Sequence, residues 1–293
     1  MDFQNILNIA YLGPEGSFSE MARDIFCDKF NINTFSTPLK TIPDVVEFVD
    51  KNPFTLGVIP VENSIDGTLR AGLDSIMATK NPNIRILSEA IMPIEYCLLS
   101  RTTEFYSITG IIGTPYLMGK CKEFIQNELP RNLNVIEHAT MVECARNLQN
   151  YNLTYGSIGN KKIAEHCMLN VLKENINDDK SNQTRYILIG DSETTPTGKD
   201  KTTIAFSVGN KPGALLEALS VFVQNGVNIT YISSRPSKTD LDEFVLLVSI
   251  DGHISNEKIM KLMIDLKPKT RFFRFLGSYS QVWLTEIRQI WYN

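Results

Sequence analysis

The sequence predicts an α/β protein of two domains, and three observations carry this prediction. First, apolar runs of strand length alternate with helical stretches over the first two thirds of the 293 residues. Second, residues 191–200 are polar, turn-rich and without periodicity, which indicates a linker between domains. Third, the residues after this linker follow the order βαββαβ, which predicts a ferredoxin-like module.

Composition places the chain among ordinary globular proteins, with 43% hydrophobic and 21% charged residues. Its 29 lysines and arginines against 33 aspartates and glutamates give a net charge of −4, which argues against a nucleic-acid partner. No apolar run reaches membrane-spanning length and the N-terminus has no basic leader, so we expect no membrane association and a cytoplasmic location. The five cysteines lack a Cys-x-x-Cys pair and the three histidines are scattered, so we expect neither a disulfide framework nor a metal site.

The elements of the first domain are predicted from capping residues and apolar runs. Ser17 and Glu20 have the spacing of a capping box that opens a helix. Thr41 opens another, with Pro43 tolerated in its first turn. The apolar run 84–99 is long enough to cross from one lobe to another. In order, we expect strand 8–12, helix 17–30, a helix from 41, strand 55–61, a helix ending near 79, the run 84–99, further strands and helices over 107–172, and strand 184–190.

The elements of the second domain are shorter and evenly spaced. We expect strand 202–208, a helix from 212, strands 227–233 and 243–250, helix 256–266 and strand 272–279. In the C-terminal tail, Trp283 and Trp291 occur at helical spacing with Ile287 and Ile290. This apolar stripe is expected to pack on a neighbouring surface, with a subunit contact as the alternative.

Two familiar kinds of site are excluded by spacing. Residues 113–120 superficially suggest a phosphate-binding loop, but the glycines are one residue too far apart. Cys121 also stands where a magnesium-binding Ser or Thr is required. No Gly-x-Ser-x-Gly elbow is present, which argues against hydrolase chemistry.

Three polar loops at predicted strand ends are the remaining candidate sites. Gly13–Ser17 brings backbone N–H groups to a helix start, which suits an anion, although a well-capped turn has the same pattern. Glu62–Ser64 places a carboxylate, an amide and a hydroxyl after a buried strand, where α/β proteins bind ligands; loop capping is the alternative. Asn182–Tyr186 combines a hydroxyl with a guanidinium. Together these loops suit a small polyanionic substrate.

These same segments resemble the signature segments of prephenate dehydratases: Gly-Pro-Glu-Gly-Ser-Phe-Ser at 13–19, Ile-Pro-Val-Glu-Asn-Ser at 59–64 and Thr-Arg-Tyr at 184–186. Their order and separations fit as well. The C-terminal part resembles an ACT domain, in which Gly213–Leu215 and Ser233–Pro236 match the segments that bind phenylalanine in this family. The resemblance covers about residues 8–280.

The resemblance implies both architecture and reaction. Residues 1–195 would form a bilobal catalytic domain that resembles a periplasmic binding protein, with one lobe at about 1–91 and 174–195 and the other at about 92–173. A ferredoxin-like ACT regulatory domain at 201–280 and a tail at 281–293 would follow. The implied reaction is decarboxylative dehydration of prephenate to phenylpyruvate in phenylalanine biosynthesis, without a cofactor because aromatisation drives it. An arogenate dehydratase and a catalytically impaired aromatic-acid sensor stay open as alternatives.

The resemblance also assigns roles to residues. Thr184, Glu62 and Asn63 are expected to be catalytic, with Thr184 donating a hydrogen bond to the leaving ring hydroxyl. The expected substrate-binding residues are Ser64, Arg185, Lys120, Thr140, Gly16 and Ser17. The expected residues for the effector phenylalanine are Gly213, Ala214, Leu215, Ser234, Arg235, Pro236 and Asn228. We expect the ACT domains to join the chain into a homodimer or homotetramer.

The chain departs from the family's motifs at several positions, three of which bear on substrate and effector binding. Gly113 replaces a serine, Lys120 replaces a substrate-contacting glutamine, and Ser233 replaces the first glutamate of the effector motif. Lys120 can still bind a carboxylate, as a point charge rather than an amide. Gly113 and Lys120 favour the sensor, whereas the intact Glu62, Asn63 and Thr184 favour the enzyme, and Ser233 bears on sensitivity to the effector.

Overall fold

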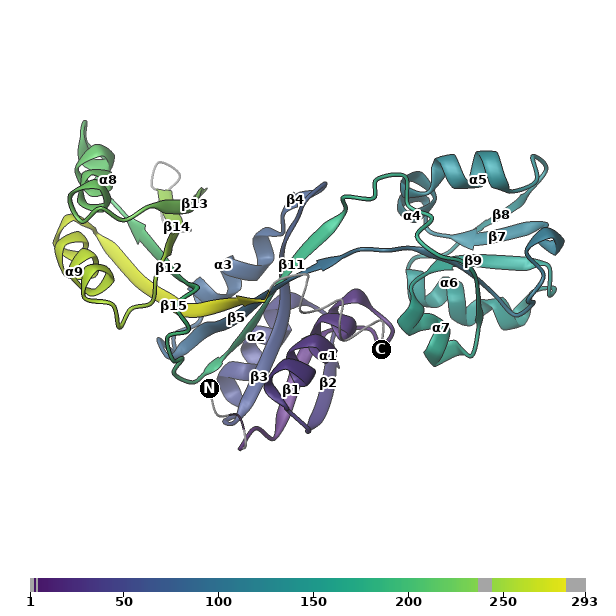
Figure 1. Cartoon of the computed structure of the whole chain (residues 1–293), viewed down its shortest axis with the longest axis horizontal. Helices are drawn as coiled ribbons and strands as arrows, with labels where there is room; N and C mark the ends of the chain where they lie inside the picture. The colour runs from purple at the N-terminus through teal and green to yellow at the C-terminus, as the bar shows by residue number, and fades with distance from the viewer. Residues whose placement is uncertain (1–2, 4, 237–243, 283–293) are drawn as a thin grey trace.

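The computed structural model describes residue 3, residues 5–236 and residues 244–282. It has the predicted α/β class: a bilobal unit with two sheets is followed by a ferredoxin-like βαββαβ module (Figure 1). The stripe predicted around Trp283, Ile287, Ile290 and Trp291 lies outside the described residues.

The first lobe is a mixed sheet with helices on both faces. Its elements are β1 (Asn8–Leu12), α1 (Phe18–Phe30), β2 (Phe35–Leu39), α2 (Ile42–Lys51), β3 (Thr55–Asn63), β4 (Gly67–Thr68), α3 (Arg70–Ala78), β5 (Ile84–Pro93) and β11 (Gln183–Asp191). Strand β1 is parallel to β2 and β3, whereas β11 is antiparallel to β3 and β5. The side chains of α1 pack with Leu56 and Leu188 on one face. Those of α2 and α3 pack with Ile59 and Ile187 on the other.

The helix starts of this lobe follow from their capping residues. Thr41 and Asp44 form a complete capping box, with Asp44 N donating to Thr41 Oγ1 at 3.2 Å and Thr41 N to Asp44 Oδ2 at 3.1 Å. Ser17 caps α1 by accepting from Glu20 N at 3.3 Å. The Glu20 carboxylate does not close the expected box on Ser17, because it accepts from the N–H of Gly16 instead.

The second lobe has its own sheet, in the order β10-β6-β9-β7-β8. Its elements are β6 (Cys97–Ser100), the 3-10 helix η1 (Phe105–Ser107), β7 (Gly110–Gly113), α4 (Pro115–Lys120), α5 (Lys122–Glu128), β8 (Asn134–Glu137), α6 (Met141–Asn147), η2 (Leu148–Asn150), β9 (Tyr155–Gly159), α7 (Lys161–Cys167) and β10 (Asn170–Lys173). The chain enters this lobe between β5 and β6 and leaves it between β10 and β11, so two connections join the lobes (Figure 1).

The C-terminal module is a four-stranded antiparallel sheet in the order β13-β14-β12-β15. Its elements are β12 (Asp200–Ser207), α8 (Ala214–Gln224), β13 (Ile229–Pro236), β14 (Phe244–Asp251), α9 (Glu257–Leu266), η3 (Lys267–Lys269) and β15 (Phe272–Val282). Both long helices pack on one face of the sheet, where Phe222 and Leu262 contact Phe206 and Val248. On the other face, Leu247 shares a core with α3 of the first lobe.

The module also joins the sheet of the first lobe directly. Strand β15 runs parallel to β5, with Ser280 opposite Ser88, and reaches the middle of the molecule (Figure 1). Gly277 allows this approach: its φ is +140°, and a Cβ atom there would lie 2.3 Å from Ile86 O. Within the residues that the structure describes, the combined sheet has ten strands.

Two features are absent from the described residues. No helix among them is both long and apolar enough to cross a membrane. No group of three or more His, Cys, Asp or Glu side chains among them is arranged to hold a metal ion.

Candidate active site

The ends of β3 and β11 bring the predicted Asn63 and Thr184 side chains together. Both residues are buried, and Asn63 Nδ2 lies 2.9 Å from Thr184 Oγ1. The same amide nitrogen lies 2.8 Å from Asn182 Oδ1 and 3.1 Å from Gln183 O. Because Asn63 donates to the threonine oxygen, Thr184 can donate its own hydroxyl hydrogen onward.

The phenol of Tyr186 lies beside this pair, in contact with the Thr184 and Ser19 hydroxyls. Burial raises the pKa of Tyr186, so the phenol stays protonated at neutral pH. Thr184 therefore faces a neutral oxygen, and no carboxylate competes for its hydroxyl hydrogen from this side. The Thr184 hydroxyl can therefore donate either to the Tyr186 oxygen or to an acceptor bound beside it.

The loop after β3 is held by the same polar cluster. Asn63 Oδ1 accepts from the backbone N–H groups of Ile65 and Asp66, each at 2.9 Å. Ser64 Oγ donates to Ser181 O at 3.1 Å and accepts from Gln183 N at 2.9 Å. The structure therefore places Ser64 where it fixes the segment that leads into β11.

Glu62 and Arg185 lie on the opposite face of the sheet from Asn63 and Thr184. The pairing of β3 with β11 shifts between Arg185 and Tyr186, so that Arg185 opposes Glu62 next to the Thr184–Asn63 pair. Arg185 Nε lies 3.1 Å from Glu62 Oε2. Its Nη1 lies 2.9 Å from Oε2 of a second carboxylate, Glu89. Burial acts to lower the pKa of Arg185, but the charges of Glu89 and Glu62 outweigh it and raise this pKa.

Lys120 reaches the first lobe from helix α4 of the second. Its Nζ lies 2.9 Å from Asp66 Oδ1, and the Tyr116 hydroxyl donates to the other oxygen of the same carboxylate. The hydrogen bond from Tyr116, together with that from Lys120, holds the pKa of Asp66 below its usual value although burial acts in the opposite direction. Gly113 lies just before this helix, and a Cβ atom there would lie 3.0 Å from Met118 Cγ. Packing against Met118 accounts for a small residue at position 113.

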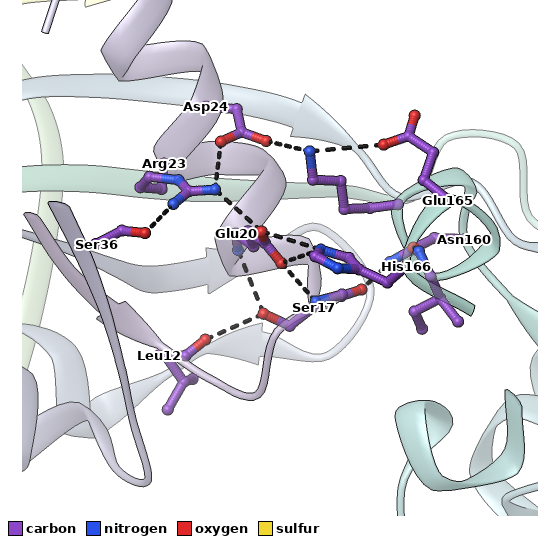
Figure 2. Close-up of polar contacts among 12 residues, drawn as sticks. Leu12, Ser17, Glu20, Arg23, Asp24, Ser36, Asn160, Glu165 and His166 are labelled. Atoms are coloured by element: carbon purple, nitrogen blue, oxygen red, sulfur yellow. Dashed lines mark hydrogen bonds and ion pairs between the residues drawn. The ribbon is translucent and has the colours of Figure 1, made fainter. Parts of the chain in front are cut away.

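The second contact between the lobes joins Gly16 and Glu20 of the first lobe to Asn160 and His166 of the second. Figure 2 shows Glu20 beside His166. Gly16 N donates to Glu20 Oε2 at 2.5 Å, and Gly16 O accepts from Asn160 Nδ2 at 3.0 Å. His166 Nε2 lies 3.1 Å from Glu20 Oε2. The backbone N–H that the sequence offered to an anion is thus used by the chain's own carboxylate. Ser17 Oγ donates to Leu12 O at 3.1 Å, so it also has an internal partner.

A charge network extends this contact along α1. Lys162 Nζ lies 2.9 Å from Asp24 Oδ2, and Arg23 contacts both Asp24 and Glu20 (Figure 2). Burial acts to raise the pKa of Glu20, but the Gly16 N–H, His166 and Arg23 outweigh it, so this pKa is lowered. Sequence reasoning missed the partners from the second lobe. Of these partners, only Asn160 could have been noticed in the sequence, because an asparagine there is typical of a helix start.

Thr140 stands apart from the other predicted substrate residues. It is exposed at the start of α6, where its hydroxyl accepts from Glu143 N at 3.2 Å. The structure shows it as a helix cap.

The predicted effector residues divide between the two ends of the C-terminal module. Gly213, with φ of +84°, begins α8, and Ala214 and Leu215 follow it. Strand β13 ends with Ser234, Arg235 and Pro236 at the same end of the module as the start of α8. This follows because Arg235 and Ser207, the last residue of β12, both oppose Val245 of β14. Asn228 precedes the start of β13 and therefore lies at the opposite end of the module. Within one chain, all of these residues except Asn228 therefore lie at the same end of the module.

Comparison with known proteins covers nearly the whole chain. Residues 9–194 match the family model described as prephenate dehydratase, and residues 202–267 match that of the ACT domain. A bifunctional chorismate mutase/prephenate dehydratase from Aquifex aeolicus is 34% identical over 98% of this chain and 77% of its own. A prephenate dehydratase from Methanocaldococcus jannaschii is 33% identical over 92% of this chain and 97% of its own. The crystal structure of a prephenate dehydratase in complex with L-Phe, from Arthrobacter aurescens, has a TM-score of 0.80 at 29% identity and covers 94% of this chain and 90% of its own.

Proposed function

This chain belongs to the prephenate dehydratase family. We therefore propose that it is a carbon–oxygen lyase that converts prephenate to phenylpyruvate. The ring carboxylate leaves as CO2, and its bonding electrons form the new ring double bond. The ring hydroxyl leaves with the C–O electrons and takes up a proton to become water. The product ring is aromatic, so no cofactor has to supply electrons.

The observation that carries the proposal is the Asn63–Thr184 hydrogen bond at 2.9 Å. A threonine is too weak an acid to give up its proton readily, so we infer that it donates a hydrogen bond to the departing hydroxyl. Asn63 occupies the threonine oxygen and directs the hydroxyl hydrogen outward. A fixed donor aimed at developing negative charge lowers the barrier because the protein has organised it before the reaction.

Glu62 is the third proposed catalytic residue. Its side chain is 36% exposed at the end of β3, and Arg185 holds it through the 3.1 Å contact. We propose that Lys120 meets a substrate carboxylate as a point charge, which requires it to exchange its Asp66 partner for the substrate. Gly16, Ser17, Ser64, Arg185 and Thr140 complete the proposed substrate-binding set.

We propose that phenylalanine regulates the enzyme at the C-terminal module. The match to the ACT domain supports this, as does the relative that was crystallised in complex with L-Phe. The proposed effector residues are Gly213, Ala214, Leu215, Ser234, Arg235, Pro236 and Asn228. Asn228 lies at the opposite end of the module from the other proposed effector residues. A second chain would therefore have to contribute its own Asn228 to the same effector site. That geometry supports the proposal of a homodimer or homotetramer, in the cytoplasm, joined through the ACT domains.

The test is a phenylpyruvate assay on the full chain with prephenate, with and without phenylalanine. Thr184→Ala is expected to keep its thermal unfolding transition and to lose about 100-fold or more in kcat, since a transition-state hydrogen bond is removed. Thr184→Ser, which retains the hydroxyl, is the matched control and should keep most of the activity. Wild-type turnover by Thr184→Ala would overturn the catalytic role proposed for Thr184.

The same assay separates the alternatives. Phenylalanine formed from arogenate, without phenylpyruvate from prephenate, would identify an arogenate dehydratase. No product from either substrate, together with phenylalanine binding, would indicate an aromatic-acid sensor.

A further inference from the structure

A buried carboxylate outside the proposed catalytic set lies behind Arg185. Glu89 is in the middle of β5 and is 2% exposed. Each of its oxygens meets one cation: Oε2 lies 2.9 Å from Arg185 Nη1, and Oε1 lies 2.8 Å from Lys201 Nζ. Burying a carboxylate is costly unless it is paired, so this position holds a glutamate only because both cations reach it.

The second cation comes from the C-terminal module. Lys201 is on β12, and its side chain is 16% exposed. The backbone brings it there, because β12 pairs with β15, and β15 pairs with β5 at the Gln281–Glu89 position. The charge that completes the Glu89 site is therefore supplied only when the module is docked on the first lobe.

Arg185 is shared between two carboxylates. Its Nη1 contacts the buried Glu89, and its Nε contacts the half-exposed Glu62, at 3.1 Å. Arg185 directly follows Thr184, and Glu62 directly precedes Asn63. The Arg185–Glu62 pair thus ties β11 to β3 on one face of the sheet, at the same two strand ends that the Asn63–Thr184 hydrogen bond ties on the other.

Glu62, Glu89, Arg185 and Lys201 line one cavity between the first lobe and the module, together with hydroxyl groups such as that of Tyr279. Side chains that line a cavity have room to change rotamer when a partner is removed. Within the described residues, a second charged pair crosses the same interface: Arg235 Nε lies 3.4 Å from Asp74 Oδ1 on α3.

We propose that Glu89 is a positioning residue for the dehydratase reaction: anchored by Lys201 of the C-terminal module, it holds Arg185 so that Arg185 fixes Glu62 and the adjacent Asn63–Thr184 pair. The proposal rests on the proposed function, since it assigns Glu89 to that reaction. It makes the docked module part of the catalytic geometry, whether or not an effector is bound.

The experiment measures kcat and KM for prephenate in the full chain. Glu89→Gln preserves shape and removes the charge, and it is expected to lower kcat about 10- to 100-fold with KM changed no more than about twofold, as displacement of reacting groups does. Lys201→Met is expected to lower kcat in the same way but less, about 3- to 10-fold, while Lys201→Arg restores it. Lys261→Met, which removes an exposed charge on α9, is the matched control and should leave kcat unchanged.

A double-mutant cycle with Arg185→Gln distinguishes positioning from general stability. If Glu89 acts through Arg185, adding Glu89→Gln to Arg185→Gln changes kcat by no more than about twofold. A further loss of kcat equal to that of the single variant would overturn the proposal, as would wild-type kcat in Glu89→Gln.

If Glu89→Gln does not fold, the Lys201 variants decide: equal kcat for Lys201→Met and Lys261→Met overturns the proposal. A wild-type chain that forms no phenylpyruvate removes the proposed function and this inference together, whereas an active wild type with unaffected variants removes only the inference.

Discussion

Replacing Asn63 by aspartate tests the orientation of the Thr184 hydroxyl. The change keeps the size of the side chain and turns its Nδ2 donor into an acceptor. Asn63 Nδ2 now lies 2.9 Å from Thr184 Oγ1 and 3.1 Å from Gln183 O. In the variant, the threonine is expected to donate its only hydrogen to the new carboxylate, so it has none left for the substrate.

The size of the effect follows from these contacts. Loss of a preorganised donor to developing charge lowers kcat by about 100- to 1,000-fold, which corresponds to about 3–4 kcal/mol. Stability falls as well, because the backbone oxygen of Gln183 cannot become a donor and would face a carboxylate in a buried site. Leaving one such group unsatisfied costs about 1–3 kcal/mol.

The assay compares kcat from phenylpyruvate formation with the free energy of unfolding from denaturant titration. Asn8→Asp is the matched control, because Asn8 Nδ2 donates to Thr37 Oγ1 at 2.9 Å between β1 and β2 in the same lobe. The Thr37 hydroxyl can donate to Asn8 Oδ1, at 3.1 Å, so that variant should keep most of its stability and its kcat within about twofold. If Asn63→Asp lost stability but kept wild-type kcat, the proposed direction of the Thr184 hydrogen bond would be wrong.

Two further predictions concern titratable groups. The pKa of Glu20 is lowered in the folded chain, so its ionised form contributes stability that is present above the usual carboxyl pKa of 4.5 and is lost as the pH falls through the lower folded value. The difference in unfolding free energy between wild type and Glu20→Gln, about 2 kcal/mol at higher pH, should therefore shrink as the pH falls below 4.5; a difference that grows below this pH contradicts the argument. Burial raises the pKa of the thiols of Cys97 and Cys144 to about 11 and that of Cys121 to about 12, so these thiols should react with a thiol reagent at pH 8 only after unfolding, and rapid labelling of the native chain would refute this.

Local sequence signals predicted the fold class well, because helix starts and strand composition depend on neighbouring residues. The helix start at Thr41 and the βαββαβ order after the linker are confirmed in the structure, whereas the capping box predicted at Ser17 is only half formed. The parallel pairing of β15 with β5 joins residues far apart in the sequence, and no local pattern specifies it. Periodicity identifies strands, but it does not identify their neighbours in a sheet.

The candidate site was predictable to a smaller extent. Asn63 and Thr184 come from segments at strand ends, and the structure places them in contact, although their roles stay predictions. The face on which Glu62 lies depends on the shift in pairing next to Tyr186, which strand alternation alone does not reveal. His166 is one of the three histidines that the sequence analysis describes only as scattered. Its contact with Glu20 depends on how the two lobes meet.

The pairing of β15 with β5 also determines what happens when the C-terminal module is absent. Cutting the chain at the linker would leave β5 as an edge strand, because residues 88–90 would lose the backbone pairing that β15 now provides. Such an edge is a template for pairing with another chain, so a fragment that ends near residue 195 is expected to aggregate even if its active-site residues are intact. The module is thus a cover for the catalytic sheet, and the two units cannot be exchanged or deleted like independent domains.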